Sequence, residues 1–273
     1  MRPGPLGLVT EALRETLSRR RLIGYLVRAD LKKKGADTLL GNLWWVVDPL
    51  LQMAVYVILV TVIRASSQED YPLFIFTAIL PWKWFTSSVG ASIQSVTSQE
   101  RLIKQIHFPK IVLPIAAAGA AVANFAFGLI ALGLLLVAFY ASRAAPTLLL
   151  IPFIAVVQFT FTLALALVVA AINVFYRDVG NVSRHVLRLW FYLSPALYST
   201  AQIHKLAESS PIVGHVMSLN PFAVLFESYR SVIYEGAPPD WTGLIRLFAV
   251  SLVLVALGTI AFKRLEPAFA KVL

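Results

Sequence analysis

Residues 111–140 read IVLPIAAAGAAVANFAFGLIALGLLLVAFY, thirty residues without one charged side chain. A bilayer core about 30 Å thick is crossed by about 20 helical residues, so this stretch can span a membrane as a helix. Four further stretches satisfy the same criterion, at residues 43–63, 73–93, 147–175 and 244–262. A sixth, at residues 182–199, carries Arg184, His185 and Arg188 in its first turns. The sequence therefore predicts an all-α membrane protein with six transmembrane helices.

The composition of the chain agrees with a membrane protein. Hydrophobic residues make up 58% of its 273 residues and its mean hydropathy is +0.75, outside the usual range of soluble domains. The chain contains no cysteine, which excludes disulfides and thiolate metal sites. The net charge of +10 favours contact with anionic phospholipid or an acidic partner over nucleic acid, because so much of the chain is apolar.

Basic residues set the expected orientation, because short cytoplasmic loops carry an excess of Lys and Arg. Six spans place both termini on one side of the membrane, and most of the 24 basic residues collect on that side. Both termini are therefore predicted to be cytoplasmic. The sixth span is supported by the same rule, since without it the basic residues at 263, 264 and 271 would lie outside the cell.

Residues 1–42 are predicted to form a cytoplasmic segment ahead of a six-span domain at residues 43–273. Val9, Leu13 and Leu17 recur every four residues, and basic side chains occupy much of the remaining surface. This pattern is typical of an amphipathic helix lying on the membrane. A positively charged topology anchor is the alternative. The segment lacks a long apolar core ahead of a small-residue cleavage site, so we do not interpret it as a signal peptide.

A separate short helix is predicted at residues 97–108, between the second and third spans. Thr97 and Glu100 have capping-box spacing, and Pro109 is expected to end the helix. Leu102, Ile103 and Ile106 would form an apolar ridge along it. A transporter driven by a peripheral motor needs such a rigid cytoplasmic projection, although an ordinary structured loop would give a similar pattern.

The external segment at residues 201–240 is too amphipathic to be a simple connection. Asn220 and Pro221 fit an N-cap and a first helical position, and Gly236 fits a C-terminal stop. A second short helix, interrupted near Pro211, is predicted at residues 203–219. These helices would either dip back into the outer leaflet and shape a pore exit, or lie at the interface.

Asp48 and Lys83 are the two clear cases of a charge buried within the predicted spans. Either is a candidate to line a hydrated pathway, while a snorkelling lysine and a helix-capping aspartate are the alternatives. The chain has no ladder of intramembrane carboxylates for ion coupling and no GxxxxGK[ST] loop to hold ATP. HExxH and GxSxG motifs are also absent, so a membrane-embedded lipid-processing enzyme is the weaker hypothesis. We therefore expect no metal or cofactor in this chain and an energy source on a separate protein.

Several short blocks carry a family resemblance, and they cover essentially the whole chain. They are LVRADLK at 26–32, LGNLWW at 40–45 running to Pro49, LIK at 102–104 with Phe108 and Pro109, FYRDV at 175–179, Trp190, Ser194, Pro195 and Tyr198, and Asn220, Pro221 and Phe222 followed by Glu227 and Arg230. In this order and spacing the chain resembles the permease subunit of polysaccharide-exporting ABC transporters, the group of O-antigen, teichoic acid and capsule exporters. It departs from them at residues 35–37, where such proteins often carry an aromatic residue.

The resemblance implies a homodimer that works with two separate ATPase subunits, which would hold ATP and Mg. It implies that the helix at 97–108 is a coupling helix received by the ATPase, with contacts from Glu100, Arg101, Leu102, Lys104, His107, Phe108 and Pro109. It also implies an external exit gate formed by Pro211, Asn220, Pro221, Phe222, Glu227 and Arg230. Arg177 and Asp178 would end the fourth span as a structural or relay pair.

The substrate implied by the resemblance is a polysaccharide attached to a polyprenyl diphosphate, moved out across the bacterial inner membrane. Arg28 and the run Lys32, Lys33 and Lys34 are predicted to bind the diphosphate at the entrance. Candidate channel aromatics that would contact sugar rings are Trp44, Trp45, Trp82, Trp84, Phe85, Trp190, Tyr192 and Tyr198, with interfacial anchoring as the alternative role. The alanine- and arginine-rich composition suits a high-GC bacterium, which makes cell-wall galactan a candidate cargo beside O-antigen. A small-lipid or drug exporter of the same architecture is the alternative function.

Overall fold

The computed structural model describes residues 4–35, 41–64, 69–106, 108–198 and 211–273, and every regular element in these ranges is helical. The long helices are α3 (Trp44–Arg64), α4 (Tyr71–Ser95), α6 (Val112–Phe139), α7 (Ile151–Phe175), α8 (Val179–Leu193) and α12 (Trp241–Val272). The shorter helices are α1 (Pro5–Ser18), α2 (Arg20–Gly35), α5 (Glu100–Gln105), α10 (Pro211–Ser218) and α11 (Pro221–Arg230). Short 3-10 turns and the π turn η5 (Ser231–Glu235) connect them.

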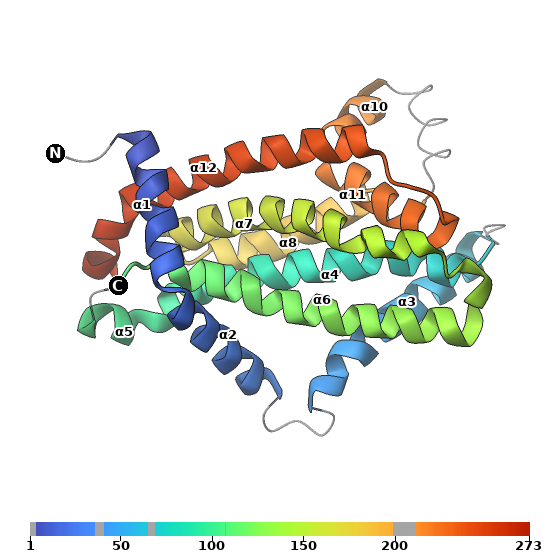
Figure 1. The fold of residues 1–273 in the computed structure, drawn as a ribbon, viewed down its shortest axis with the longest axis horizontal. Coiled ribbons are helices and arrows are strands. Elements are labelled where there is room, and N and C mark those ends of the chain that lie inside the picture. The colour runs from blue at the N-terminus through green and yellow to red at the C-terminus, as the bar shows by residue number, and fades with distance from the viewer. Residues whose placement is uncertain (1–3, 36–40, 65–68, 107, 199–210) are drawn as a thin grey trace.

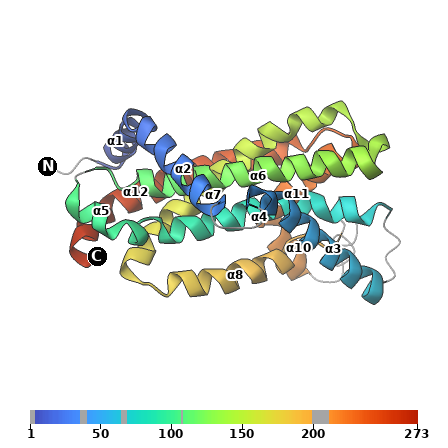
Figure 2. The ribbon, with the colours of Figure 1, turned by 90° about the horizontal axis from the view of Figure 1, so that it is seen from below.

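The long helices form one bundle. Figure 1 shows α4, α6, α7 and α12 extending along the same axis, with α3 inclined to them. Helix α8 extends along one edge of the bundle (Figure 2) and packs against α4 and α7. Helix α5, the C-terminus and α1 lie at one end of the bundle, and α10 and α11 lie toward the other (Figure 1).

Four of the described helices are long and apolar enough to cross a membrane. They are α3, α6, α7 with the turn before it, and α12. The structure therefore confirms the all-α membrane class. Helix α4 is long enough but misses the hydropathy criterion, and α8, with 15 residues, is too short, so the count of six spans stays a prediction. At about 1.5 Å per residue, however, the 25 residues of α4 extend for about 37 Å, which exceeds the bilayer core.

Helix α4 can be less apolar than the other long helices because it lies inside the bundle, where few of its side chains would contact lipid. It packs against α3, α6, α7, α8 and α11, and the side chains from Leu73 to Trp82 are all buried. Polar side chains of α7 hold its backbone: Gln158 donates a hydrogen bond to the carbonyl oxygen of Pro81, and Asn173 donates to that of Ile93, both at 2.8 Å. Such bonds satisfy backbone groups within a membrane, where water is absent.

The predicted amphipathic segment is two helices rather than one, because the chain breaks between α1 and α2 at Arg19. Leu13 and Leu17 of the predicted stripe are 60% and 61% exposed. Leu22, Ile23 and Leu26 of α2 pack instead on a core cluster that contains Ala12 of α1. The two helices therefore hold to the bundle by one side and leave an apolar side uncovered, as a membrane-surface helix would.

Candidate functional site

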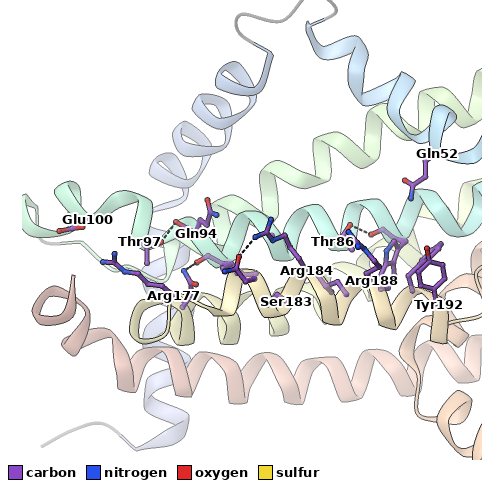
Figure 3. A pocket seen from close by; sticks show the side chains of 18 of the residues that line it. Gln52, Thr86, Gln94, Thr97, Glu100, Arg177, Ser183, Arg184, Arg188 and Tyr192 are labelled. Carbon is purple, nitrogen blue, oxygen red and sulfur yellow. Dashed lines mark hydrogen bonds between the residues drawn. The ribbon is translucent and has the colours of Figure 1, made fainter. Parts of the chain in front are cut away.

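A polar groove of about 830 Å³ follows the bundle between α3, α4 and α8 (Figure 3). Near α5 it is lined by Thr97, Glu100 and Leu273, and at its far end by Tyr56 and Tyr192. Its other polar lining residues are Gln52, Thr86, Gln94, Asn173, Arg177, Asn181, Ser183, Arg184 and Arg188. Unpaired polar groups are costly in a membrane, so this concentration of them indicates a path for water or a polar molecule.

The polar wall of the groove comes from the amphipathic sequence of α8. Asn181, Arg184, Arg188 and Tyr192 recur every three or four residues, so they share one side of the helix. Val182, Val186, Leu189 and Leu193 recur in the same way on another side, and each is at least half exposed. An exposed apolar stripe on a membrane protein faces lipid or a second subunit.

Three arginines follow one another along the groove between Glu100 and Tyr192 (Figure 3). Arg184 and Arg188 are four residues apart, which corresponds to about 6 Å along the helix axis. Arg184 donates a hydrogen bond to Oδ1 of Asn181. No ion pair between a carboxylate and either of these two arginines occurs in the described part of the chain. The middle of the groove is therefore positively charged.

Aromatic rings line the far end of the groove. The ring centroid of Phe191 lies 5.6 Å from that of Tyr56 and 5.4 Å from that of Trp82, and Tyr192 adjoins them. Sugar rings have apolar C–H faces that can pack on such surfaces, while their hydroxyls need hydrogen-bonding groups. The groove contains both kinds of wall.

The eight predicted channel aromatics occupy four different settings. Trp82 and Tyr192 line the groove, and the hydroxyl of Tyr198 donates a hydrogen bond to the carbonyl oxygen of Tyr192. Phe85 and Trp190 lie in the core that joins α4, α8 and α11, where both rings pack on Phe222. Trp45 and Trp84 line a second cavity, and Trp44 is 43% exposed.

Asp48 and Lys83, predicted separately as intramembrane charges, form an ion pair between α3 and α4. The second cavity, of about 340 Å³, lies around them and is also lined by Ser87 and Asn124. The pair joins α3, which buries few of its side chains, to the well-buried α4. Sequence reasoning treated the two charges one at a time, because nothing in their spacing indicates that α3 and α4 are neighbours at this depth.

The predicted helix at 97–108 is shorter than expected and starts differently. A 3-10 turn at Thr97–Gln99 leads into α5, which ends at Gln105, and Ile106 is already extended. The capping box is wrong, because the hydroxyl of Thr97 bonds to the carbonyl oxygen of Gln94 at the end of α4. Helix α4 continues almost directly into this turn, so the first N–H groups find backbone partners and need no side-chain cap.

Helix α5 is exposed at the end of the bundle but tied to it. The ammonium of Lys104 donates hydrogen bonds to Glu100 and to the carbonyl oxygen of Leu273, both at 2.7 Å. This contact lowers the pKa of the Glu100 carboxyl. Arg101 is exposed, and the remaining predicted coupling residues Leu102, Phe108 and Pro109 are partly buried. His107 lies outside the described residues.

Helix α11 begins at Pro221, as predicted, whereas α10 extends from Pro211 to Ser218 without the break that the sequence predicted near Pro211 and Gly214. Asn220 is the N-cap that the sequence predicts, since its side chain accepts a hydrogen bond from the backbone of Phe222 at 3.0 Å. It also accepts one from the indole of Trp190 at 3.1 Å and donates one to Ser194 at 2.9 Å, which ties α11 to the end of α8. Residues 201–210 of the predicted gate segment lie outside the described residues.

Arg230, at the other end of α11, is 2% exposed. Its guanidinium donates to the carbonyl oxygen of Ala196 at 2.7 Å and lies 3.9 Å from the ring centroid of Phe74. Glu227, one turn earlier, is partly buried. Arg230 is therefore a buried side chain that binds the segment following α8, and it does not face a solvent-filled exit.

The predicted entrance residues lie away from the groove. Arg28, Lys32 and Lys33 are exposed on α2, and Lys34 follows them in the same helix. Of the predicted relay pair, Arg177 lines the groove, whereas Asp178 is the exposed residue that precedes α8. The arginines at 184 and 188 entered the sequence argument only as topology signals, yet their helical spacing with Asn181 and Tyr192 could have identified the polar face.

A charge cluster that the sequence did not reveal joins α1 to α12. The side chain of Lys263 is 8% exposed, and its ammonium lies 2.9 Å from Glu11, 2.9 Å from Glu15 and 3.2 Å from Glu266. Glu266 also accepts a hydrogen bond at 2.6 Å from the backbone N–H of Lys110, in the chain between α5 and α6.

Among the described residues, no group of His, Cys, Asp and Glu side chains is suited to hold a metal ion.

A helical bundle with four candidate membrane spans and a polar groove fits a transport permease. The chain matches the ABC-2 type transporter family over residues 21–234 and belongs to it. It is 35% identical to the O-antigen export system permease protein RfbA of Myxococcus xanthus, over 95% of this chain and 98% of that one. Two proteins of the same name from Klebsiella pneumoniae are 26% and 25% identical, each over 92% of this chain and 95% of their own.

Proposed function

We propose that this chain is the transmembrane subunit of an ATP-driven exporter that moves a polyprenyl-diphosphate-linked polysaccharide out across the bacterial inner membrane. The observation that carries the proposal is the groove between α3, α4 and α8, whose polar, basic and aromatic walls suit a glycan more than an apolar lipid or drug. The relatives from Myxococcus xanthus and Klebsiella pneumoniae are named as O-antigen export permeases, which supports the same substrate class. O-antigen, teichoic acid and cell-wall galactan are the candidate cargoes.

The groove is open along one side, which supports a homodimer as the transporting unit. Exposed apolar residues border it on both α3 and α8: Leu51, Val55 and Ile58 on one, Val182, Val186 and Leu189 on the other. A second copy of the chain apposed to these faces would close two grooves into one channel. In this arrangement residues 1–42 stay at the cytoplasmic surface and residues 43–273 form the six-span domain.

Two ATPase subunits, which would hold ATP and Mg, supply the energy by binding α5. Helix α5 is exposed, polar and contiguous with α4, which forms the floor of the groove. A displacement of α5 therefore passes directly into a groove-lining helix. Helices α10 and α11 lie toward the opposite end of the bundle and would shape the exit.

The test is purification of the tagged permease in mild detergent, with identification of co-purifying proteins and an ATPase assay. We expect an ATPase in equal ratio, whose activity rises with added polyprenyl-linked glycan. The variants Arg101→Ala, Lys104→Ala and Phe108→Ala should reduce this stimulation, while Arg246→Ala, exposed at the other end of the bundle, should not.

Each alternative function predicts a different result. Stimulation by a small lipid or drug, but not by the glycan, would identify an exporter of that other class. A permease that stays alone as a dimer and shows lipid-processing activity without nucleotide would overturn the transport proposal.

A further inference from the structure

We propose that Arg184 and Arg188 form a binding site for the diphosphate group of the transported lipid-linked substrate, inside the groove. This inference rests on the proposed function and assigns the diphosphate to different residues from those on α2. The two guanidinium groups extend from successive turns of α8 into the groove (Figure 3).

The chemistry of the pair matches two adjacent phosphates. Each guanidinium presents N–H groups in a fork that fits two phosphate oxygens, and it stays charged at any physiological pH. Four residues along a helix separate the two side chains by about 6 Å, so both forks can converge on one diphosphate. The hydroxyl of Thr86 and the amides of Gln94 and Asn181 line the same stretch and can bind the remaining oxygens.

Five other basic side chains of the described bundle already have partners. Lys83 is paired with Asp48, Lys104 with Glu100, and Arg143 with Asp70. Lys263 is surrounded by three carboxylates, and Arg230 is bonded to backbone carbonyls. Arg184 and Arg188, in contrast, are exposed in the groove and form no ion pair with a carboxylate among the described residues. An anionic ligand would supply the missing charge.

The position of the pair also orders the substrate along the groove. Tyr192 lies one helical turn beyond Arg188, and Phe191 and Tyr56 adjoin it. A diphosphate on the arginines therefore places the sugar attached to it against this aromatic end. The groove would bind the phosphate–sugar junction as a unit, with the phosphates nearer to α5.

The experiment measures binding without ATP, with the permease–ATPase complex in nanodiscs of phosphatidylcholine. Undecaprenyl diphosphate is titrated and its retention measured by native mass spectrometry, beside undecaprenyl monophosphate and phosphatidylglycerol. Because charge-assisted hydrogen bonds each contribute about 1.5–3 kcal/mol, we expect each of Arg184→Gln and Arg188→Gln to weaken diphosphate binding roughly tenfold or more. Arg188→Lys should retain part of the affinity, and the matched control Arg246→Gln should bind as the wild type does.

Three results would overturn the site. The first is that the double variant Arg184→Gln with Arg188→Gln binds the diphosphate as tightly as the wild type does. The second is that Arg246→Gln weakens diphosphate binding as much as the groove variants do. The third is that the wild type retains phosphatidylglycerol as well as it retains the diphosphate. The thermal unfolding midpoint shows whether the double variant is folded. If it is not, the diphosphate affinities of the single variants and of Arg188→Lys test the site instead. Failure of the proposed function looks different, since diphosphate would bind through the two arginines while glycan stimulated no ATPase activity.

Discussion

Lys263 shows how a single buried charge can organise the cytoplasmic end of the bundle. Three carboxylates surround its ammonium, two from α1 and one from its own helix, and the last of these also holds the backbone between α5 and α6. The three acids would repel one another without the central cation. One lysine therefore connects the N-terminal helix, the C-terminal helix and the segment that follows α5.

We expect Lys263→Met to lower the free energy of unfolding by about 3 kcal/mol, because breaking a buried ion pair leaves uncompensated charges. The thermal unfolding midpoint of the detergent-purified protein measures the loss, and faster proteolysis within α1 locates it. Lys263→Arg should keep most of the stability. Lys271→Met, which removes an exposed lysine from the same helix, is the control. A fall in midpoint as large in that control would contradict the role of the cluster.

Asn220 combines two functions that a pair of substitutions can separate. As an N-cap it serves α11, and as a bridge it accepts a hydrogen bond from the partly buried indole N–H of Trp190. Asn220→Ala should cost about 1 kcal/mol for the cap and about 1–3 kcal/mol for the unpaired indole. Asn220→Ser keeps a capping oxygen but is too short to bridge, so it should recover only the first part. Equal midpoints for the two variants in thermal unfolding would show that the cap contributes nothing.

At the scale of elements, the contact between α7 and α12 depends on Gly258. A Cβ atom at this position would lie 3.1 Å from the backbone carbonyl oxygen of Ala164, closer than a carbon normally approaches, and a backbone atom cannot rotate away. The absence of a side chain therefore lets the two spanning helices pack closely, as small residues commonly do between membrane helices.

We expect Gly258→Val to destabilise the protein by about 1–3 kcal/mol through overpacking. Gly133→Val is the matched control, since it introduces the same β-branched side chain into a spanning helix where no heavy atom lies within 4 Å of the new Cβ. Thermal unfolding of both variants beside the wild type gives the comparison. The packing argument fails if the two substitutions lower the midpoint equally.

At the scale of the whole molecule, the pattern of apolar residues predicted those features that are set within a single helix. Apolar runs located the helical cores of α3, α4, α6, α7 and α12, and Asn220 with Pro221 located the start of α11. Contacts between side chains of two different helices could not be predicted, because the sequence pattern does not indicate which helices are neighbours. The Asp48–Lys83 pair, the Lys263 cluster and the bridge from Asn220 to Trp190 are all of this kind.

The number of spans is a property of the whole chain, and it can be measured because the chain has no cysteine. Helices α4 and α8 decide the count, since α4 misses the hydropathy criterion that α3, α6, α7 and α12 satisfy and α8 is shorter than the length criterion. With six spans, Ser98 before α5 is cytoplasmic and Ala141 after α6 is external. With four spans, the same two positions exchange sides.

We therefore expect Ala141→Cys to react with a membrane-impermeant maleimide in intact cells, and Ser98→Cys to react only after the membrane is opened. Both positions are exposed in the structure, so the side of the membrane and not burial decides their labelling. Reagent reaching Ser98→Cys but not Ala141→Cys in intact cells would remove α4 from the membrane, since both positions precede α8 and report on α4 alone. That result would place α5 outside the cell, beyond the reach of any cytoplasmic ATPase, and the coupling proposal would fail with it.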